Sequence, residues 1–179
     1  MLIAAGVVAL LLAGVGLALS VVLTFRVNRM LDHQFDTAKW RPESIPKGTL
    51  VGDYPKLVDV DGRPWQRAGE DDEPWVLSFL SMSCTGCKEQ MPRYLKFLRD
   101  HNLSREQAIS VVVGDDSDLE ALNTELGATS RIVRIEEAAQ IVVDLKVTTW
   151  PTYAIVAPDS TVAFATGSVT RLAHRGLAV

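Results

Sequence analysis

The chain has 179 residues, of which 47% are hydrophobic, and its formal net charge is −4. This length suits one globular domain with an additional segment, because domains commonly span about 100–150 residues. The lysines and arginines do not gather into a basic stripe, so the sequence does not indicate a nucleic-acid-binding surface.

The first 25 residues are almost entirely apolar. Residues 1–25 carry no charged side chain, and Ser20 and Thr24 are the polar side chains among them. A helix of this length would be about 37 Å long, which is enough to cross a hydrocarbon layer of about 30 Å with some tilt. A cleaved signal peptide normally has a basic start and a shorter apolar region, and a helix buried in a soluble core rarely lacks a polar face over so many turns. The sequence therefore predicts a single-pass transmembrane helix over residues 1–25.

A stalk and linker are expected over residues 26–48. Arg26 and Arg29 come directly after the apolar run, and by the positive-inside rule they favour a cytoplasmic location for the C-terminal side of the span. Pro42 and Pro46 interrupt any helix that continues from the membrane segment. The remaining residues are long enough to form one domain with a single core.

Predicted strands and helices alternate along residues 49–179. Strands are expected at residues 57–60, 75–80, 109–113, 131–135, 152–156 and 161–164, and helices at 87–100, 117–126 and 136–145. The run 75–80 is short and continuously apolar, which is typical of a central buried strand. The last two strands are separated only by a Pro-Asp-Ser turn and would pair as a hairpin. This order predicts an α/β layer fold with a mixed sheet.

The two cysteines of the chain are Cys84 and Cys87, separated by Thr85 and Gly86. Cysteines this close join only a tiny loop, so a disulfide between them would add little stability, and the pair indicates chemistry instead. Because the pair lies between a predicted strand and a predicted helix, Cys84 would lie at a helix N-terminus, where amide groups and the helix dipole stabilise an anion such as a thiolate. We therefore assign Cys84 as the nucleophile and Cys87 as the resolving cysteine of disulfide exchange.

Other interpretations of the cysteine pair have less support. A zinc site needs four ligands, and the three histidines, His33, His101 and His174, are not spaced as a ligand pair. Covalent haem attachment would need a histidine directly after Cys87, where Lys88 stands. A structural vicinal disulfide stays open as an alternative. No metal and no cofactor are therefore expected.

In these features the chain resembles the thioredoxin superfamily, and most of all the membrane-anchored TlpA-, ResA- and MauD-like thiol–disulfide oxidoreductases. The likeness spans residues 49–166 and rests on the strand–CxxC–helix unit, on Pro92 in the helix, and on the sequence Trp150-Pro151-Thr152. The resemblance implies a thioredoxin-like fold, a proline kink in the helix, and a cis-proline loop against the cysteines. It also implies that Trp150 binds substrate through its main chain and that Pro151 shapes the substrate groove.

The chain departs from the family pattern at several positions. Ser78 stands where thioredoxin has a buried aspartate, and Gln90 stands where ResA-like proteins often have a glutamate. A carboxylate that accepts the proton of Cys87 is therefore not evident. Trp150 is larger than the residue usual before the cis-proline, so it would narrow the groove or add an aromatic contact. The final helix of the family is expected to be short or missing.

The resemblance implies a disulfide reductase or exchange protein that acts on client proteins and takes electrons from an upstream thiol donor. The MauD-like likeness adds a role in the maturation of another enzyme. The family's usual location is extracytoplasmic, which we favour over the side that Arg26 and Arg29 indicate. A non-catalytic module that holds a client or a metal is the alternative. A thiol peroxidase is disfavoured, because the Pro and Thr pattern before a lone cysteine is missing from the sequence.

Overall fold

The computed structural model describes residues 45–65, 73–136 and 139–177, with five single residues nearer the N-terminus, which are helical: Gly14, Ser20, Val22, Leu23 and Arg26. The chain divides into two compact units, Met1–Trp40 and Arg41–Val179, and the second is named the C-terminal unit. Among the described residues, no helix combines the length and the apolar character needed to cross a membrane. The predicted membrane segment lies almost wholly outside these residues and stays a prediction.

A five-stranded mixed sheet forms the centre of the C-terminal unit, with the strand order β3-β2-β1-β4-β5. The strands are β1 (Trp75–Ser81), β2 (Ala108–Val113), β3 (Arg131–Arg134), β4 (Thr152–Val156) and β5 (Val162–Thr166). The first three strands run parallel to one another, whereas β4 is antiparallel to both β1 and β5. The predicted α/β fold with a mixed sheet and a closing hairpin is confirmed.

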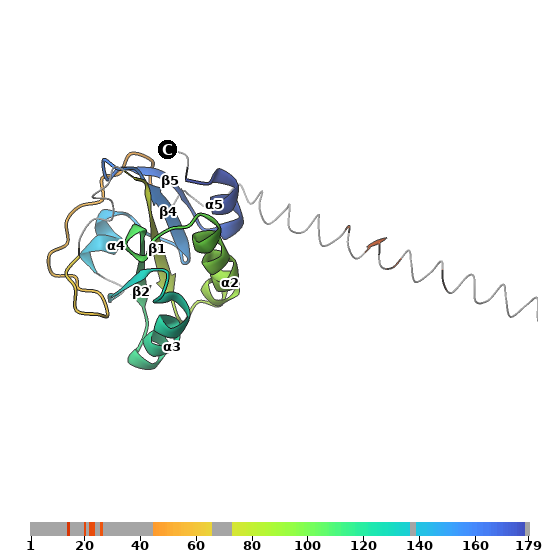
Figure 1. Cartoon of the computed structure of the whole chain (residues 1–179), viewed down its shortest axis with the longest axis horizontal. Helices are drawn as coiled ribbons and strands as arrows, with labels where there is room; N and C mark the ends of the chain where they lie inside the picture. Colours follow the sequence, from red (N-terminus) through yellow and green to blue (C-terminus); the bar gives the residue numbers. More distant parts are fainter. Residues whose placement is uncertain are drawn as a thin grey trace, which may run out of the picture. The chain divides into compact units, whose positions relative to one another are not determined.

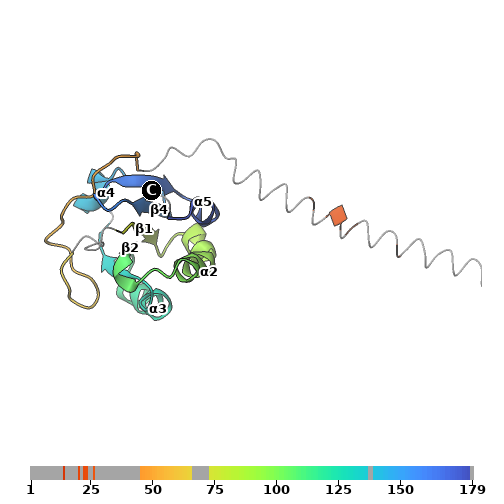
Figure 2. The ribbon, with the colours of Figure 1, turned by 45° about the horizontal axis from the view of Figure 1, so that its top comes forward.

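Helices cover both faces of this sheet. They are α2 (Thr85–Asp100), the short 3-10 helix η1 (Arg105–Gln107), α3 (Asp116–Leu126), α4 (Gln140–Asp144) and α5 (Val169–Arg175). Figures 1 and 2 show α2, α3 and α5 on one face and α4 on the other, and the buried side chains divide in the same way. The α2 helix continues through Pro92. The final helix is short, as expected, and α4 is shorter than the predicted helix at 136–145.

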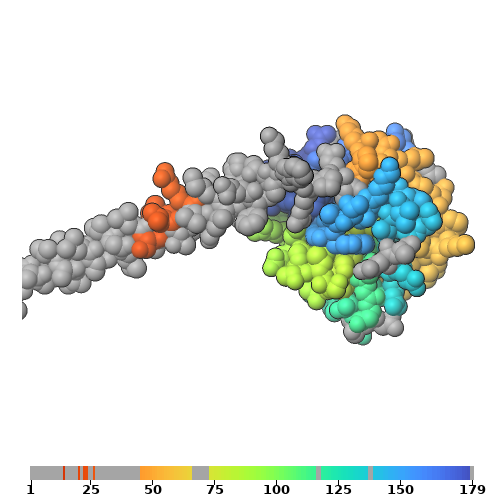
Figure 3. Space-filling model, turned by 180° about the vertical axis from the view of Figure 1, so that it is seen from behind, coloured from red at the N-terminus to blue at the C-terminus, as the bar shows by residue number. Residues whose placement is uncertain are grey.

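The segment of residues 45–65, called the edge segment, borders β5 near its start. The main-chain N–H of Gly48 donates to the Val162 carbonyl at 2.8 Å, and the Val162 N–H donates to the Thr49 carbonyl at 2.9 Å. Ile45 is 1% exposed and belongs to the core. Ile45 and Gly48, which the sequence predicted as linker, thus pack on the C-terminal unit. Figure 3 shows this segment, in orange, on the surface beside the blue atoms of the α4 region.

The edge segment borders β3 near its other end. Asp59 forms an isolated bridge with Val133, and its carboxylate accepts a hydrogen bond from Arg131 Nε at 2.9 Å. The side chains of this ion pair are 0% and 5% exposed. The predicted strand at residues 57–60 is wrong, because isolated bridges take its place. One segment therefore borders both outer strands, and covered edges resist pairing with other chains.

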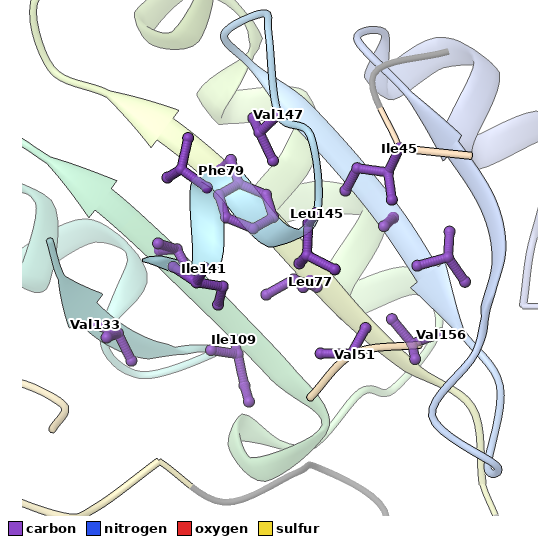
Figure 4. Close-up of a cluster of buried hydrophobic side chains, with 14 of the residues drawn as sticks. Ile45, Val51, Leu77, Phe79, Ile109, Val133, Ile141, Leu145, Val147 and Val156 are labelled. Atoms are coloured by element: carbon purple, nitrogen blue, oxygen red, sulfur yellow. The ribbon is translucent and has the colours of Figure 1, made fainter. Parts of the chain in front are cut away.

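Side chains of β1 alternate between two buried clusters. Leu77 and Phe79 join the cluster on the α4 face, whereas Val76 joins the cluster under α2. Figure 4 shows the first cluster, in which Ile141 and Leu145 of the α4 region lie over Leu77 and Phe79. Every residue of β1 is buried, as expected for a strand with helices on both faces. The carboxyl end of this rigid strand positions the cysteines.

Candidate active site

Cys84 lies where β1 has ended and α2 begins. It is the N-cap residue of the helix, with φ −87° and ψ 115°, and its carbonyl accepts hydrogen bonds from the Cys87 and Lys88 N–H groups at 3.1 and 3.3 Å. Its side chain is half-buried and is a free thiol. As predicted, this cysteine is at the positive end of a helix dipole, a position that stabilises a negatively charged sulfur.

Cys87 lies one turn into the helix and is fully buried. Its sulfur accepts a hydrogen bond from the main-chain N–H of Ser81 at 3.4 Å. The pairing of β1 with β4 ends at Phe79 and Thr152. The Cys87 sulfur therefore accepts its hydrogen bond from a main-chain N–H of β1 that lies just beyond the paired part of the two strands. Burial raises the pKa of Cys87 to about 12, which the Ser81 N–H opposes and the neighbouring Cys84 reinforces. Cys87 therefore rests as a thiol near neutral pH.

The Trp150–Pro151 loop lies directly against the helix start. The peptide bond between the two residues is cis, as the resemblance implied. The thiol of Cys84 donates a hydrogen bond to the Trp150 carbonyl oxygen at 3.4 Å. A β-carbon added to Gly86 would lie 3.8 Å from both Cys84 Sγ and Pro151 Cδ. The fold thus brings together all four predicted site residues.

The indole ring of Trp150 packs on the central sheet and does not project fully into solvent. It makes an edge contact with Phe79, with ring centroids 6.3 Å apart and an interplanar angle of 67°. The side chain is half-buried and packs against both hydrophobic clusters. Of the two effects expected for so large a residue, the structure therefore shows an aromatic contact with the sheet.

Gln90 ties α2 to the start of α5. Its Nε2 donates to the Gly167 carbonyl at 3.2 Å, and its Oε1 accepts from the Val169 N–H at 2.9 Å. The amide therefore uses a donor and an acceptor at once, which an ionised glutamate cannot do because it has no donor. At this position the chain has a connection between two helices in place of the carboxylate that ResA-like proteins often have.

Ser78 begins a chain of buried hydroxyl groups below α2. Its Oγ donates to Ser110 Oγ at 2.9 Å, Ser110 Oγ lies 2.8 Å from Ser130 Oγ, and Ser130 Oγ donates to the Ala108 carbonyl at 3.0 Å. Three neutral side chains thus occupy the region where thioredoxin has its aspartate. In the part of the chain that the structure describes, the groups that shift the pKa of Cys87 are the Ser81 N–H and Cys84, and neither is a carboxylate.

Sequence inspection missed Ser110 and Ser130 as members of this region. The available signal was a serine in the middle of each of two apolar runs, at Ser78 and Ser110. The pairing of β1 with β2 places these two serines opposite each other, which the sequence alone does not show. Within the described ranges, no cluster of three or more histidine, cysteine, aspartate or glutamate side chains has the arrangement of a metal site.

Comparison with known proteins places this geometry in a fold family. No family model and no curated protein matches the chain. A secreted Mycobacterium tuberculosis disulfide oxidoreductase homologous to E. coli DsbE matches with 15% identity and a TM-score of 0.56, over 69% of this chain and 94% of that one. The thioredoxin domain of a Bacteroides vulgatus thiol–disulfide oxidoreductase matches with 12% identity and a TM-score of 0.59, over 75% and 100% of the two chains.

A thio-disulfide isomerase from Thermus thermophilus matches with 20% identity and a TM-score of 0.54, over 73% of this chain and 93% of that one. Identities this low establish a shared fold. The sheet order, the CxxC motif at the start of α2 and the cis-proline loop agree with it. The C-terminal unit therefore has the thioredoxin-like fold, as the resemblance implied.

Proposed function

We propose that this protein is a thiol–disulfide oxidoreductase that acts on client proteins through Cys84 and Cys87. The observation that carries the proposal is the unequal environment of the two sulfurs. Cys84 is half-buried at a helix N-terminus beside the Trp150 carbonyl, whereas Cys87 is fully buried against the Ser81 N–H. An accessible first thiol and a shielded second thiol suit a two-step exchange. The oxidoreductases among the structural neighbours support this function.

The reaction we propose is reduction of a client disulfide. The Cys84 thiolate attacks one client sulfur, a Cys84–client bond forms, and the other client sulfur leaves and takes up a proton. Cys87 then attacks Cys84, the Cys84–Cys87 bond forms, and the second client sulfur leaves as a thiol. The client gains two electrons and two protons, so an upstream thiol donor has to reduce the protein again. Maturation of another enzyme is the role that the MauD-like resemblance favours.

Trp150 and Pro151 would border the client segment. The Trp150 carbonyl lies 3.4 Å from Cys84 Sγ, and Pro151 lies beside Gly86 at the same end of the helix. A client disulfide that reaches Cys84 has to approach this loop. The main chain of Trp150 is therefore our candidate for pairing with an extended client segment.

Exchange by the purified full-length chain tests the proposal. A reduced sample should reduce a disulfide-bonded protein substrate, and Cys84→Ser and Cys87→Ser should each abolish turnover. Cys87→Ser should also accumulate a mixed disulfide on Cys84, seen by mass spectrometry, because the resolving thiol is gone. Lys96→Ala, an exposed change on the same helix, serves as the control with unchanged turnover. Absence of exchange in the wild type, with client binding that survives loss of both cysteines, would favour the non-catalytic module.

We also propose that residues 1–25 anchor the protein in the cell membrane as a single span and that the redox unit lies outside the cytoplasm. The uncharged run supports the anchor, and the proposed redox function suits an oxidising compartment. An impermeant thiol reagent applied to intact cells should label Cys84, with Cys84→Ser as the blank. Labelling only after the cells are permeabilised would place the unit on the cytoplasmic side that Arg26 and Arg29 indicate.

A further inference from the structure

The hydroxyl of Thr152 closes the Trp150–Pro151 loop. Thr152 Oγ1 donates a hydrogen bond to the Thr149 carbonyl at 2.7 Å, and the hydroxyl oxygen of Thr149 lies 3.5 Å from it. Trp150 and Pro151 are the two residues between the ends of this contact. The side chain at the first position of β4 therefore holds the loop that lies against Cys84.

Thr152 occupies a position that suits an entirely apolar side chain. It is 0% exposed, and it pairs with Phe79 of β1. Residues two and four places further along a strand share one face, and here these residues, Ala154 and Val156, belong to the cluster on the α4 face. Valine has nearly the shape of threonine and suits a strand as well, whereas a buried hydroxyl costs free energy unless it is hydrogen-bonded. The contact with the loop therefore explains the hydroxyl.

This contact restrains the main chain of Trp150 from one side, and Pro151 restrains it from the other. The ring of a proline fixes its own φ angle. On the other side, rotation of the peptide group between Thr149 and Trp150 would break the 2.7 Å hydrogen bond to the Thr149 carbonyl. The direction of the Trp150 carbonyl, which lies 3.4 Å from Cys84 Sγ, is thus set before any client arrives.

We infer that Thr152 is a positioning residue for client binding, whose hydroxyl acts through Thr149 to hold the Trp150 main chain in the arrangement that pairs with an extended client segment. The inference rests on the proposed function. Ordering a loop at the moment of binding costs conformational entropy, and a loop that is already ordered avoids this cost. Loss of the hydroxyl therefore weakens the interaction with a client that pairs with the loop.

The effect should depend on the size of the substrate. A client segment that extends along the loop uses the main chain of Trp150, whereas a small disulfide needs only to reach the sulfur of Cys84. The same bonds form and break at the cysteines with both substrates. Thr152 therefore contributes to the preference for an extended client and has little influence on the sulfur chemistry itself.

Two substrates with one leaving group separate binding from chemistry. The first is a short extended peptide whose single cysteine forms a mixed disulfide with a coloured aromatic thiol, and the second is the same mixed disulfide on a lone cysteine with blocked ends. Rapid mixing of each with the reduced full-length chain gives a rate constant for release of the aromatic thiol by Cys84. The ratio of the two rate constants, peptide to small substrate, measures the preference. A loss of folded protein lowers both rates equally and cancels in this ratio.

Thr152→Val keeps the shape of the side chain and removes the hydroxyl. It should lower the rate constant with the peptide by about five- to tenfold, the scale of one hydrogen bond, and should leave the rate constant with the small substrate at the wild-type value. Thr152→Ser keeps the hydroxyl and should restore most of the lost preference.

Thr129→Val is the matched control. Thr129 Oγ1 donates to the Leu126 carbonyl at 3.1 Å, which is also three residues back in the chain, but this contact lies between α3 and β3. The variant should keep the ratio of the wild type.

The possible failures are distinguishable. The inference is overturned, with the proposed function intact, by a wild type that does not prefer the peptide or by a wild-type ratio in Thr152→Val. An equal fall of the ratio in Thr129→Val, or in Thr152→Ser, overturns it as well. A wild-type protein that releases the thiol from neither substrate contradicts the proposed function itself.

Discussion

The two faces of the central sheet bury different kinds of side chain, although the same strands build both. The α4 face holds an aliphatic and aromatic cluster that includes Leu77 and Phe79. The α2 face holds Cys87, the serine hydroxyl chain and two tyrosine hydroxyls among its apolar residues. The first face stabilises the unit, whereas the second combines stability with the groups that surround the cysteine sulfurs. Buried polar atoms without a partner among the described residues lie on both faces, as the indole N–H groups of Trp65 and Trp75 on the α4 face and the hydroxyls of Tyr94 and Tyr153 on the α2 face. The serine hydroxyl chain lies on the α2 face, the face that also buries Cys87.

The largest loss of stability is expected at a buried ion pair, which interrupts the apolar character of the α4 face. Arg131 is the cross-strand neighbour of Ile109, a core residue of the α4 face, and pairs with the buried Asp59 at the β3 edge. Asp59→Ala removes the buried carboxylate partner of Arg131 and leaves the exposed Glu106 carboxylate, 3.7 Å away, as its acidic partner. It should reduce the free energy of unfolding by about 3–5 kcal/mol, measured by denaturant titration. Lys96→Ala breaks an exposed ion pair and should change it by less than about 1 kcal/mol.

The same ion pair predicts a pH dependence of stability. Burial acts to raise the pKa of Asp59, but hydrogen bonds from the Arg63 N–H, Arg131 and the Asp61 N–H outweigh it and lower the pKa below its ordinary value of 3.8. A carboxyl with a lowered folded-state pKa stabilises the protein fully above its ordinary pKa, and the contribution is lost as the pH falls through the folded-state pKa. Asp59→Asn should therefore flatten the acid limb of the stability profile. An acid limb identical to that of wild type would contradict this.

A smaller loss of stability is expected in the middle of the α4 face. Leu77→Ala removes a fully buried side chain and should cost about 3 kcal/mol, from lost apolar burial and the cavity left behind. Thermal or denaturant unfolding measures the loss. The exchange rate per folded molecule should stay unchanged, and a parallel loss of exchange would show that the two faces are not separable.

The α2 face should be less sensitive to loss of a hydroxyl. Ser110→Ala removes the middle member of the serine chain and leaves the Ser78 and Ser130 hydroxyls with fewer partners. We expect a loss of about 1–2 kcal/mol in the free energy of unfolding, measured by denaturant titration. A neutral result would mean that the three hydroxyls rearrange around the gap.

The smallest effect is expected at the link between α2 and α5. Gln90→Ala removes both amide contacts to the start of α5 and should cost about 1 kcal/mol. Glu89→Ala, at the exposed neighbouring position, is the control. Both variants should exchange disulfides at the wild-type rate, and a selective loss of exchange in Gln90→Ala would give this amide a part in the chemistry.

Local patterns predicted the cysteines and most of the strands. Cys84 and Cys87 form a short motif between an apolar run and a helix, so their setting is visible along the sequence. The position of Tyr153 opposite Ser78 depends on the register of β4 with β1, and the contact between Ser78 and Ser110 depends on the register of β1 with β2. Neither register is contained in a local pattern. Residues 45–48 and the strand expected at 57–60 were misassigned for the same reason, because partners such as Val162 and Val133 lie far away in the chain.

The edge segment also constrains the order in which the unit can assemble. Gly48 and Val51 donate main-chain hydrogen bonds to the carbonyls of Val162 and Ser160, so residues near the start of the unit bind residues near its end. During synthesis on the ribosome Gly48 and Val51 emerge before the β4–β5 hairpin that supplies these partners, whereas Asp59, near the other end of the edge segment, can pair as soon as β3 has been made. The part of the C-terminal unit that is made first is therefore among the last to take its place.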